Sequence, residues 1–107
     1  MIKVRVIAQF KVDGVVATGF YLDIMLPAFF PGMSLMIGLG HNEVTLHPTV
    51  EADKCHWFDN SCQGDEDGDI SDHIEMLLDM GTCDYFGDRD PTEEDFKADP
   101  RWTLKPF

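Results

Sequence analysis

The first 26 residues alternate between apolar and polar side chains around one Asp-Gly pair, which restricts this end of the chain to a β-hairpin. Over residues 2–12 the apolar side chains share one parity and the basic and amide side chains the other, interrupted by Ile7. A period of two is typical of a strand with one buried and one solvated face. Asp13-Gly14 supplies the positive φ angles of a two-residue turn. Residues 15–26 are therefore expected to return as the second strand, with a bulge or a close approach at Gly19.

Proline and glycine divide the next part of the chain into short pieces. Two prolines and a glycine over residues 27–32 end the second strand in a turning connection. Pro48 places a later strand at a sheet edge or ends it. Three more strands are expected, over residues 33–39, 43–50 and 54–58. Residues 1–58 are thus predicted to form an antiparallel meander or a small curled sheet.

Two helices are expected beyond residue 58. The apolar residues Ile70, Ile74, Leu77 and Leu78 fit one stripe of a helix over residues 69–80, which Gly81 would end. A second helix should begin at Asp90-Pro91-Thr92-Glu93 and end near Ala98, because Asp, Pro and Glu take the preferred first positions of a helix. Trp102 and Phe107 indicate that the tail docks on the rest of the protein. The predicted class is α+β: an N-terminal antiparallel sheet of four or five strands, packed by one or two C-terminal helices.

Charge divides the chain unevenly. Residues 1–50 contain three acids and three cations, so their net charge is zero. Residues 51–107 contain seventeen acids and five cations and therefore carry the whole net charge of −12. We predict one domain over residues 1–107, with a neutral β-rich half (1–58) and an acidic loop–helix half (59–107). Acids gathered on one face would steer a basic partner and repel nucleic acid and anionic membranes.

The excess of acids in residues 51–107 predicts a small acidic, non-catalytic protein that binds a basic surface of another macromolecule, as inhibitors, immunity-type proteins and nucleic-acid mimics do. The expected partner is a basic protein, or the nucleic-acid-binding surface of a protein, with no direct nucleic-acid or membrane binding. The residues expected to touch it are seven acids and two aromatics: Asp65, Glu66, Asp67, Asp69, Asp72, Glu75, Asp79, Phe29 and Phe30.

Phe29 and Phe30 lie between two prolines in the turn that follows the hairpin. In one interpretation they belong to the core. In the other they project outward as a hydrophobic anchor for a partner or for a second copy of the chain. A homodimer, and a purely structural subunit, are therefore further alternatives.

Metal binding, to zinc or calcium, is the main alternative function, as a regulator or as a metal or thiol enzyme. An EF-hand alignment on Gly68 places Gln63 and Ile74 where a calcium loop needs carboxylates. The candidate zinc ligands have no finger-like spacing; they are Cys55, His56, Cys62, His73 and Cys83. No cofactor is expected.

No catalytic pattern stands out. Cys55 and His56 are adjacent, so on a strand their side chains point to opposite faces. Three cysteines without a secretory leader indicate free thiols in the cytoplasm, with a Cys55–Cys62 disulfide as the alternative. The longest uncharged run, residues 24–40, is too short and too interrupted for a spanning helix.

Overall fold

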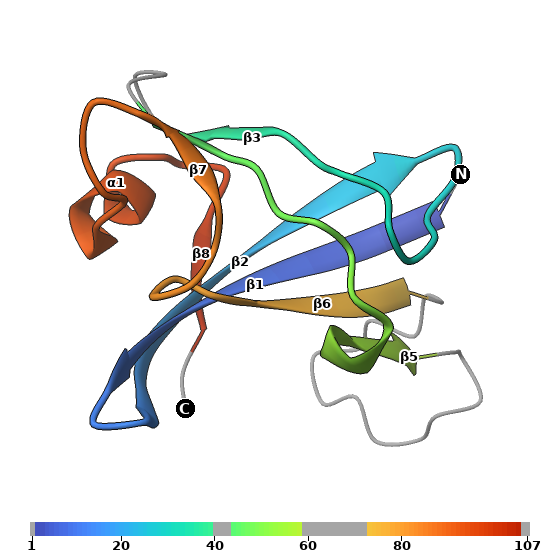
Figure 1. The fold of residues 1–107 in the computed structure, drawn as a ribbon, viewed down its shortest axis with the longest axis horizontal. Coiled ribbons are helices and arrows are strands. Elements are labelled where there is room, and N and C mark those ends of the chain that lie inside the picture. Colours follow the sequence, from blue (N-terminus) through green and yellow to red (C-terminus); the bar gives the residue numbers. More distant parts are fainter. Residues whose placement is uncertain (1, 40–43, 59–72, 106–107) are drawn as a thin grey trace.

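The structure is a computed structural model that describes residues 2–39, 44–58 and 73–105. Strands β1 (Ile2–Val12) and β2 (Val15–Leu26) form the predicted hairpin. Its turn residues Asp13 and Gly14 have φ angles of 54° and 80°, as the tight turn requires. A five-stranded sheet is built around this hairpin in the order β5-β6-β1-β2-β8 (Figure 1). Its other strands are β5 (Cys55–Phe58), β6 (His73–Asp79) and β8 (Thr103–Lys105).

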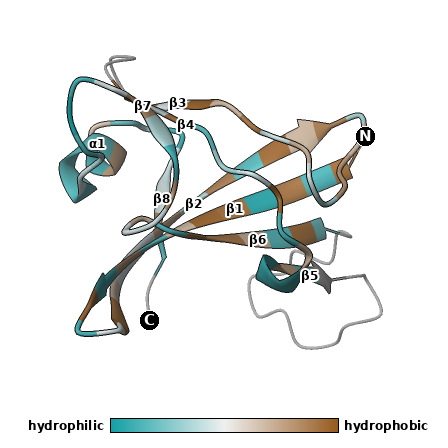
Figure 2. Cartoon of the chain, viewed as in Figure 1, coloured by the Kyte–Doolittle hydropathy of each residue, from teal (hydrophilic) through white to brown (hydrophobic). Residues whose placement is uncertain are grey.

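The irregularity in the hairpin lies two residues before the predicted one. Phe10 pairs with Thr18, and the next residue of β1 pairs with Val16, so Ala17 is the extra residue of a bulge. Gly19 instead lies in regular register between Gln9 of β1 and Lys105 of β8. Alternating hydrophobic and hydrophilic bands along β1 and β2 are visible in Figure 2.

The predicted helix over residues 69–80 is wrong for the part that the structure describes, because residues 73–79 form strand β6. This strand runs parallel to β1, with Val4 opposite Ile74 and Ala8 opposite Leu78. Ile74, Met76 and Leu78 share the face that points into the core, as the period of a strand requires. The stripe that indicated a helix arises because β6 is an inner strand and also places an apolar residue on its other face. Residues 69–72 lie outside the described residues.

A second sheet has the order β3-β4-β7. Its strands are β3 (Ile37–Leu39), β4 (Val44–Leu46) and β7 (Tyr85–Gly87). A bridge between Ser34 and Thr49 extends the β3–β4 pair. The strands predicted over residues 33–39 and 43–50 thus exist in shorter form. The predicted meander is wrong in its pairing, because β3 and β4 form a separate sheet and β5 pairs with β6.

Both sheets contribute side chains to one buried cluster. The first sheet supplies Val4, Val6, Ala8, Phe20, Leu22, Met76 and Leu78, and the second supplies Ile37, Leu39, Val44 and Leu46. Phe96 of helix α1 (Glu93–Lys97) completes the cluster and is fully buried. Its ring centroid lies 5.2 Å from that of Phe20 and 4.8 Å from that of Trp102. The aromatic tail therefore docks through Trp102, as expected, and Phe107 lies outside the described residues.

The second predicted helix is confirmed as α1, which is shorter than expected and begins later. Its N-cap is Thr92, and the Thr92 and Asp95 side chains form the capping box in place of the predicted Asp90 start. The described residues contain one other helical segment, the 3-10 turn η1 (Ala52–Lys54). The fold is therefore mostly β, and the predicted α+β class contains too much helix. Neither helical segment of the described chain has the length and apolar character needed to cross a membrane.

Candidate functional site

The two faces of the five-stranded sheet differ in chemistry. We call the face turned away from the buried cluster the open face. Its charged groups from β1, β2, β6 and β8 are four cations and three acids: Lys3, Arg5, Lys11, Lys105, Asp23, Glu75 and Asp79. The open face therefore holds half of the chain's eight cations and carries no excess of negative charge.

Ion pairs join most of the charges on the open face. Arg5 Nε lies 2.8 Å from Asp23 Oδ1, and the Arg5 guanidinium lies 4.5 Å from the centre of the Tyr21 ring. Lys11 Nζ lies 3.3 Å from Asp79 Oδ2. Ile7, in the middle of this face, is 1% exposed because Tyr21 and Leu77 flank it on the neighbouring strands. The open face is a self-neutralised surface, so a basic partner gains little from it.

Elsewhere in residues 2–39, 44–58 and 73–105, ten acids face four cations. Three of these cations are held in ion pairs: Arg89 with Asp95, Lys97 with Glu94, and Arg101 with Asp99. The acids that form no ion pair with a described residue are Asp13, Glu51, Asp53, Asp84, Asp88, Asp90 and Glu93. Most of them lie in two segments, η1 with its N-cap and the region of β7.

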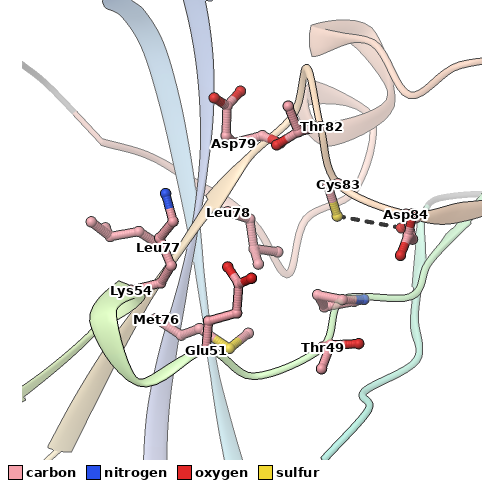
Figure 3. A pocket seen from close by; sticks show the side chains of 11 residues that line it. Thr49, Glu51, Lys54, Met76, Leu77, Leu78, Asp79, Thr82, Cys83 and Asp84 are labelled. Atoms are coloured by element: carbon pink, nitrogen blue, oxygen red, sulfur yellow. Dashed lines mark hydrogen bonds between the residues drawn. The ribbon is translucent and has the colours of Figure 1, made fainter. Parts of the chain in front are cut away.

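These two segments meet at a cavity of about 260 Å³, which we call the acidic groove (Figure 3). Its lining residues come from the connection between β4 and β5, from the end of β6 and from the turn that follows β6: Pro48, Thr49, Glu51, Lys54, Met76, Leu77, Leu78, Asp79, Thr82, Cys83 and Asp84. The Glu51 carboxylate points into the hollow towards Leu78, and Asp79 and Thr82 lie at the opposite end. The groove thus has carboxylates at its rim and buried apolar side chains, Met76 and Leu78, beneath them.

Backbone hydrogen bonds fix the walls of the acidic groove. The His47 N–H donates to the Asp84 carbonyl at 2.8 Å, which ties the connection after β4 to the start of β7. In the turn after β6, the Cys83 N–H donates to the Asp79 carbonyl at 2.8 Å. The Gly81 N–H donates to Asp79 Oδ1 at 2.9 Å. The Lys54 N–H donates to the Glu51 carbonyl at 3.0 Å, so Glu51 and Asp84 are both held by backbone bonds that do not involve their carboxylates.

The three carboxylates of the groove are not equivalent. The hydrogen bond from the Gly81 backbone lowers the pKa of Asp79, and Lys11 and Lys54 lower it further. Among the described residues, Glu51 and Asp84 have no side-chain partner within hydrogen-bond or ion-pair distance. Lys54 is the one cation among the described lining residues. The described lining residues thus carry three carboxylates and one cation, and Glu51 and Asp84 form no ion pair with a described residue.

Cys83 lines the groove as an unreactive thiol. Burial, followed by the charges of Asp84 and Asp79, raises its pKa to about 11. Its Sγ donates to the Asp84 carbonyl at 3.3 Å. Burial and the charge of Asp53 also raise the pKa of Cys55. Since the thiolate is the reactive form, neither environment activates a nucleophile at neutral pH.

A second cavity of about 420 Å³ adjoins the groove, because Cys83 lines both. We call it the apolar cavity. Its walls are Phe10, Lys11, Met80, Gly81, Cys83, Tyr85, Asp90 and Pro91. Its two charged groups already have partners: Lys11 pairs with Asp79, and Asp90 accepts a hydrogen bond from the Tyr85 hydroxyl. Lys11 is therefore neutralised, Asp90 keeps its negative charge beside the Tyr85 hydroxyl, and the other six walls are uncharged and offer apolar contact to a ligand.

The predicted partner-binding residues are dispersed. Asp79, at the end of β6, belongs to the open face and also lines the groove, and Glu75 lies on the open face, 3.8 Å from His73. Phe29 is half-buried against the core and Phe30 is 55% exposed, so the two aromatics divide between the alternatives considered for them. Five predicted acids lie outside the described residues: Asp65, Glu66, Asp67, Asp69 and Asp72.

Sequence reasoning missed Glu51 and Asp84. Each lies a few residues from a short strand, at positions with no periodicity, and they meet only because β6 and β7 fold back over the connection after β4. The available signal was the absence of a nearby cation in sequence around Asp84.

The candidate metal ligands do not gather. Among the residues that the structure describes, no group of three or more His, Cys, Asp or Glu side chains is arranged to hold a metal ion. Cys55 and Cys83 are free thiols, and Cys62 lies outside the described residues. His73 is buried beside Glu75, and His56 is exposed.

The sequence matches no protein-family model, and comparisons with curated proteins and with solved structures find no significant match.

Proposed function

We propose that this protein is a non-catalytic binding protein that engages a basic surface of another macromolecule through the acidic groove. The observation that carries the proposal is a preformed hollow lined by two carboxylates, Glu51 and Asp84, that form no ion pair with a described residue. A Lys or Arg side chain of a partner would meet both carboxylates there and rest its aliphatic stem on the buried apolar side chains.

The rest of the charge pattern supports the same surface. The open face is neutralised by its own ion pairs, and five of the seven acids that form no ion pair with a described residue lie in η1 with its N-cap and in the region of β7. Residues 59–72 add six acids and no cation to the sequence. A net charge of −12 would speed the approach of a basic partner, with an effect that falls as salt screens it. Free thiols at Cys55 and Cys83 fit a reducing compartment, and we place the function in the cytoplasm.

Binding to immobilised poly-L-lysine, with poly-L-glutamate as the reference surface, tests this function. The variant pair Glu51→Gln/Asp84→Asn removes the two groove charges. The matched pair Asp53→Asn/Asp88→Asn removes the same number of charges from neighbouring acids that do not line the groove. We expect the groove variant to lose about 0.5–2 kcal/mol of binding free energy, since an exposed ion pair contributes about 0.2–1 kcal/mol, and the matched variant to lose clearly less.

Salt completes the test, because screening shortens the reach of charge from about 10 Å at 0.1 M to about 3 Å at 1 M. Binding that survives high salt would contradict the proposal. Equal losses in the two variant pairs would show that the acids act only through net charge, as they do when they merely keep a protein soluble.

A further inference from the structure

Two cavities with different chemistry share one wall. The acidic groove is lined by Glu51 and Asp84, which form no ion pair with a described residue. Six of the eight residues that line the apolar cavity are uncharged, while Lys11 is paired with Asp79 and Asp90 accepts a hydrogen bond from the Tyr85 hydroxyl. Cys83 lines both cavities, and its thiol is neutral at physiological pH. Lys11 of the apolar cavity also pairs with Asp79 of the groove at 3.3 Å, so the two cavities adjoin at this ion pair as well as at Cys83.

The shape of each cavity limits what it can hold. Small-ligand sites usually have volumes of about 300–1,000 Å³, so hollows of about 260 and 420 Å³ lie around the lower end of that range and have room for single side chains. The carboxylates of the groove select a cationic group. Phe10, Met80 and Pro91, together with the Tyr85 ring, select an apolar or aromatic one.

We infer that the two cavities together recognise an extended segment of a partner protein, with a Lys or Arg side chain in the acidic groove and an apolar side chain in the apolar cavity. Side chains two residues apart on an extended chain point to the same side, about 6.6 Å apart, which suits two adjoining hollows. This inference rests on the proposed function and adds the sequence class of the partner.

The apolar cavity also offers a matched pair of residues for its test. Tyr85 and Phe86 are neighbours on β7, so their side chains point to opposite faces of the strand. Tyr85 lines the cavity, whereas the Phe86 ring lies 4.8 Å from the His47 ring and does not line it. Replacing either residue by Ala removes an aromatic ring, and one of the two replacements alters the cavity.

The experiment titrates the protein with three peptides, acetyl-Lys-Ala-Phe-amide, acetyl-Glu-Ala-Phe-amide and acetyl-Lys-Ala-Ser-amide, and follows backbone amide shifts by NMR. We expect the Lys-Ala-Phe peptide to shift Glu51, Cys83 and Tyr85 together and to bind about three- to tenfold more tightly than either of the others. Tyr85→Ala should remove the advantage of Phe over Ser, and Phe86→Ala should keep it. If a variant folds poorly, the affinities of the unaltered protein for the Phe and Ser peptides still test whether the apolar cavity prefers an aromatic side chain.

The outcomes separate this inference from the function it rests on. Equal affinity for the Phe and Ser peptides, with poly-L-lysine binding intact, would overturn the two-cavity inference and leave the proposed function standing. Amide shifts confined to residues outside the two cavities would likewise overturn the two-cavity inference and leave the proposed function standing. Equal affinity for the Lys and Glu peptides, together with loss of the poly-L-lysine result, would overturn both.

Discussion

Two acid-rich regions of this protein differ in whether their carboxylates form ion pairs. In the corner between α1 and β8, which we define as residues 92–102, Asp95 and Asp99 are each bonded by an arginine. In the acidic groove, Glu51 and Asp84 form no ion pair with any residue that the structure describes, although Lys54 lines the same groove. The ion pairs of the corner stabilise the fold, whereas the carboxylates of the groove remain available to the proposed basic partner. The difference shows that a count of acids indicates little until each acid is assigned a partner.

The corner is also part of the core. Phe96 is fully buried, with its ring packed against those of Phe10, Phe20 and Trp102. Asp99 is 4% exposed and accepts hydrogen bonds from Arg101 through the backbone N–H and the guanidinium. The same Arg101 donates to the Gly38 carbonyl at 2.6 Å, which joins the corner to β3 of the second sheet. Changes in the corner should therefore lower stability, and changes in the groove should not.

The largest effect is expected from Phe96→Ala. Loss of a fully buried ring leaves a cavity among three aromatic neighbours and should lower the free energy of unfolding by about 3–5 kcal/mol. Urea denaturation measures the change. Phe86→Ala is the control, because that ring is 54% exposed and its loss should cost about 1 kcal/mol or less. Similar losses from the two variants would contradict the packing described for α1.

Arg101→Ala should have the next largest effect. It removes the guanidinium from a buried carboxylate and also the bond to Gly38. Because Arg101 itself is half-exposed, we expect a loss of about 2–3 kcal/mol, below the full cost of breaking a buried pair. Lys54→Ala removes one cation that forms no ion pair and should change stability by about 0.5 kcal/mol or less. A loss at Arg101 no larger than at Lys54 would show that Asp99 does not need its partner.

Acid should weaken the corner through Asp95. Hydrogen bonds from Arg89, followed by those from Thr92, lower the pKa of Asp95 from 3.8 to about 2. A lowered pKa in the folded protein means that the stabilisation is present above pH 3.8 and is lost as the pH falls towards 2. Asp95→Asn should therefore lower stability at neutral pH and reduce the further loss between these two pH values by about 1 kcal/mol, after allowance for solvent screening. Glu94→Gln, on the exposed side of α1, should leave the acid profile unchanged in urea titrations at each pH.

The smallest effect on stability is expected in the groove. Glu51→Gln/Asp84→Asn removes two like charges that have no cation beside them, so unfolding should change by about 0.5 kcal/mol or less, in the direction of greater stability. Thermal melts at low salt are the most sensitive measurement. A large loss of stability would mean that these carboxylates hold the fold, and the contrast with the corner would disappear.

Local signals predicted the hairpin and the presence of α1, although the N-cap is Thr92 and not the predicted Asp90. The alternation over residues 2–12 and the Asp13-Gly14 turn act between neighbouring residues, and so does the capping of a helix. These signals can be recognised in the sequence without knowledge of any contact between distant residues. Prediction failed at β6, where Ile74, Met76 and Leu78 do alternate, because Leu77 on the other face completes an apparent helical stripe. Ile7 interrupts the alternation of β1 for the same reason, because it lies opposite Leu77 on this second face of the sheet.

The acidic groove was beyond the reach of the sequence for a different reason. Its walls come from residues 48–54, 76–79 and 82–84, and no spacing relates the first segment to the others. Of the predicted acids, Asp79 lines the groove, while its carboxylate turns out to be satisfied locally by Gly81 and Lys11. The charge asymmetry predicted an acidic surface in general terms. It could not indicate which acids have a cation beside them.

The parallel pairing of β1 with β6 has a consequence for how the polypeptide matures. It joins Val4 to Ile74, and β8 then joins Phe20 to Leu104, so the sheet depends on contacts between distant parts of the chain. Such topologies fold slowly, commonly in milliseconds to seconds. During translation the early hairpin must wait with its apolar face uncovered until residues beyond 100 leave the ribosome, and in that interval it is open to aggregation and to chaperones.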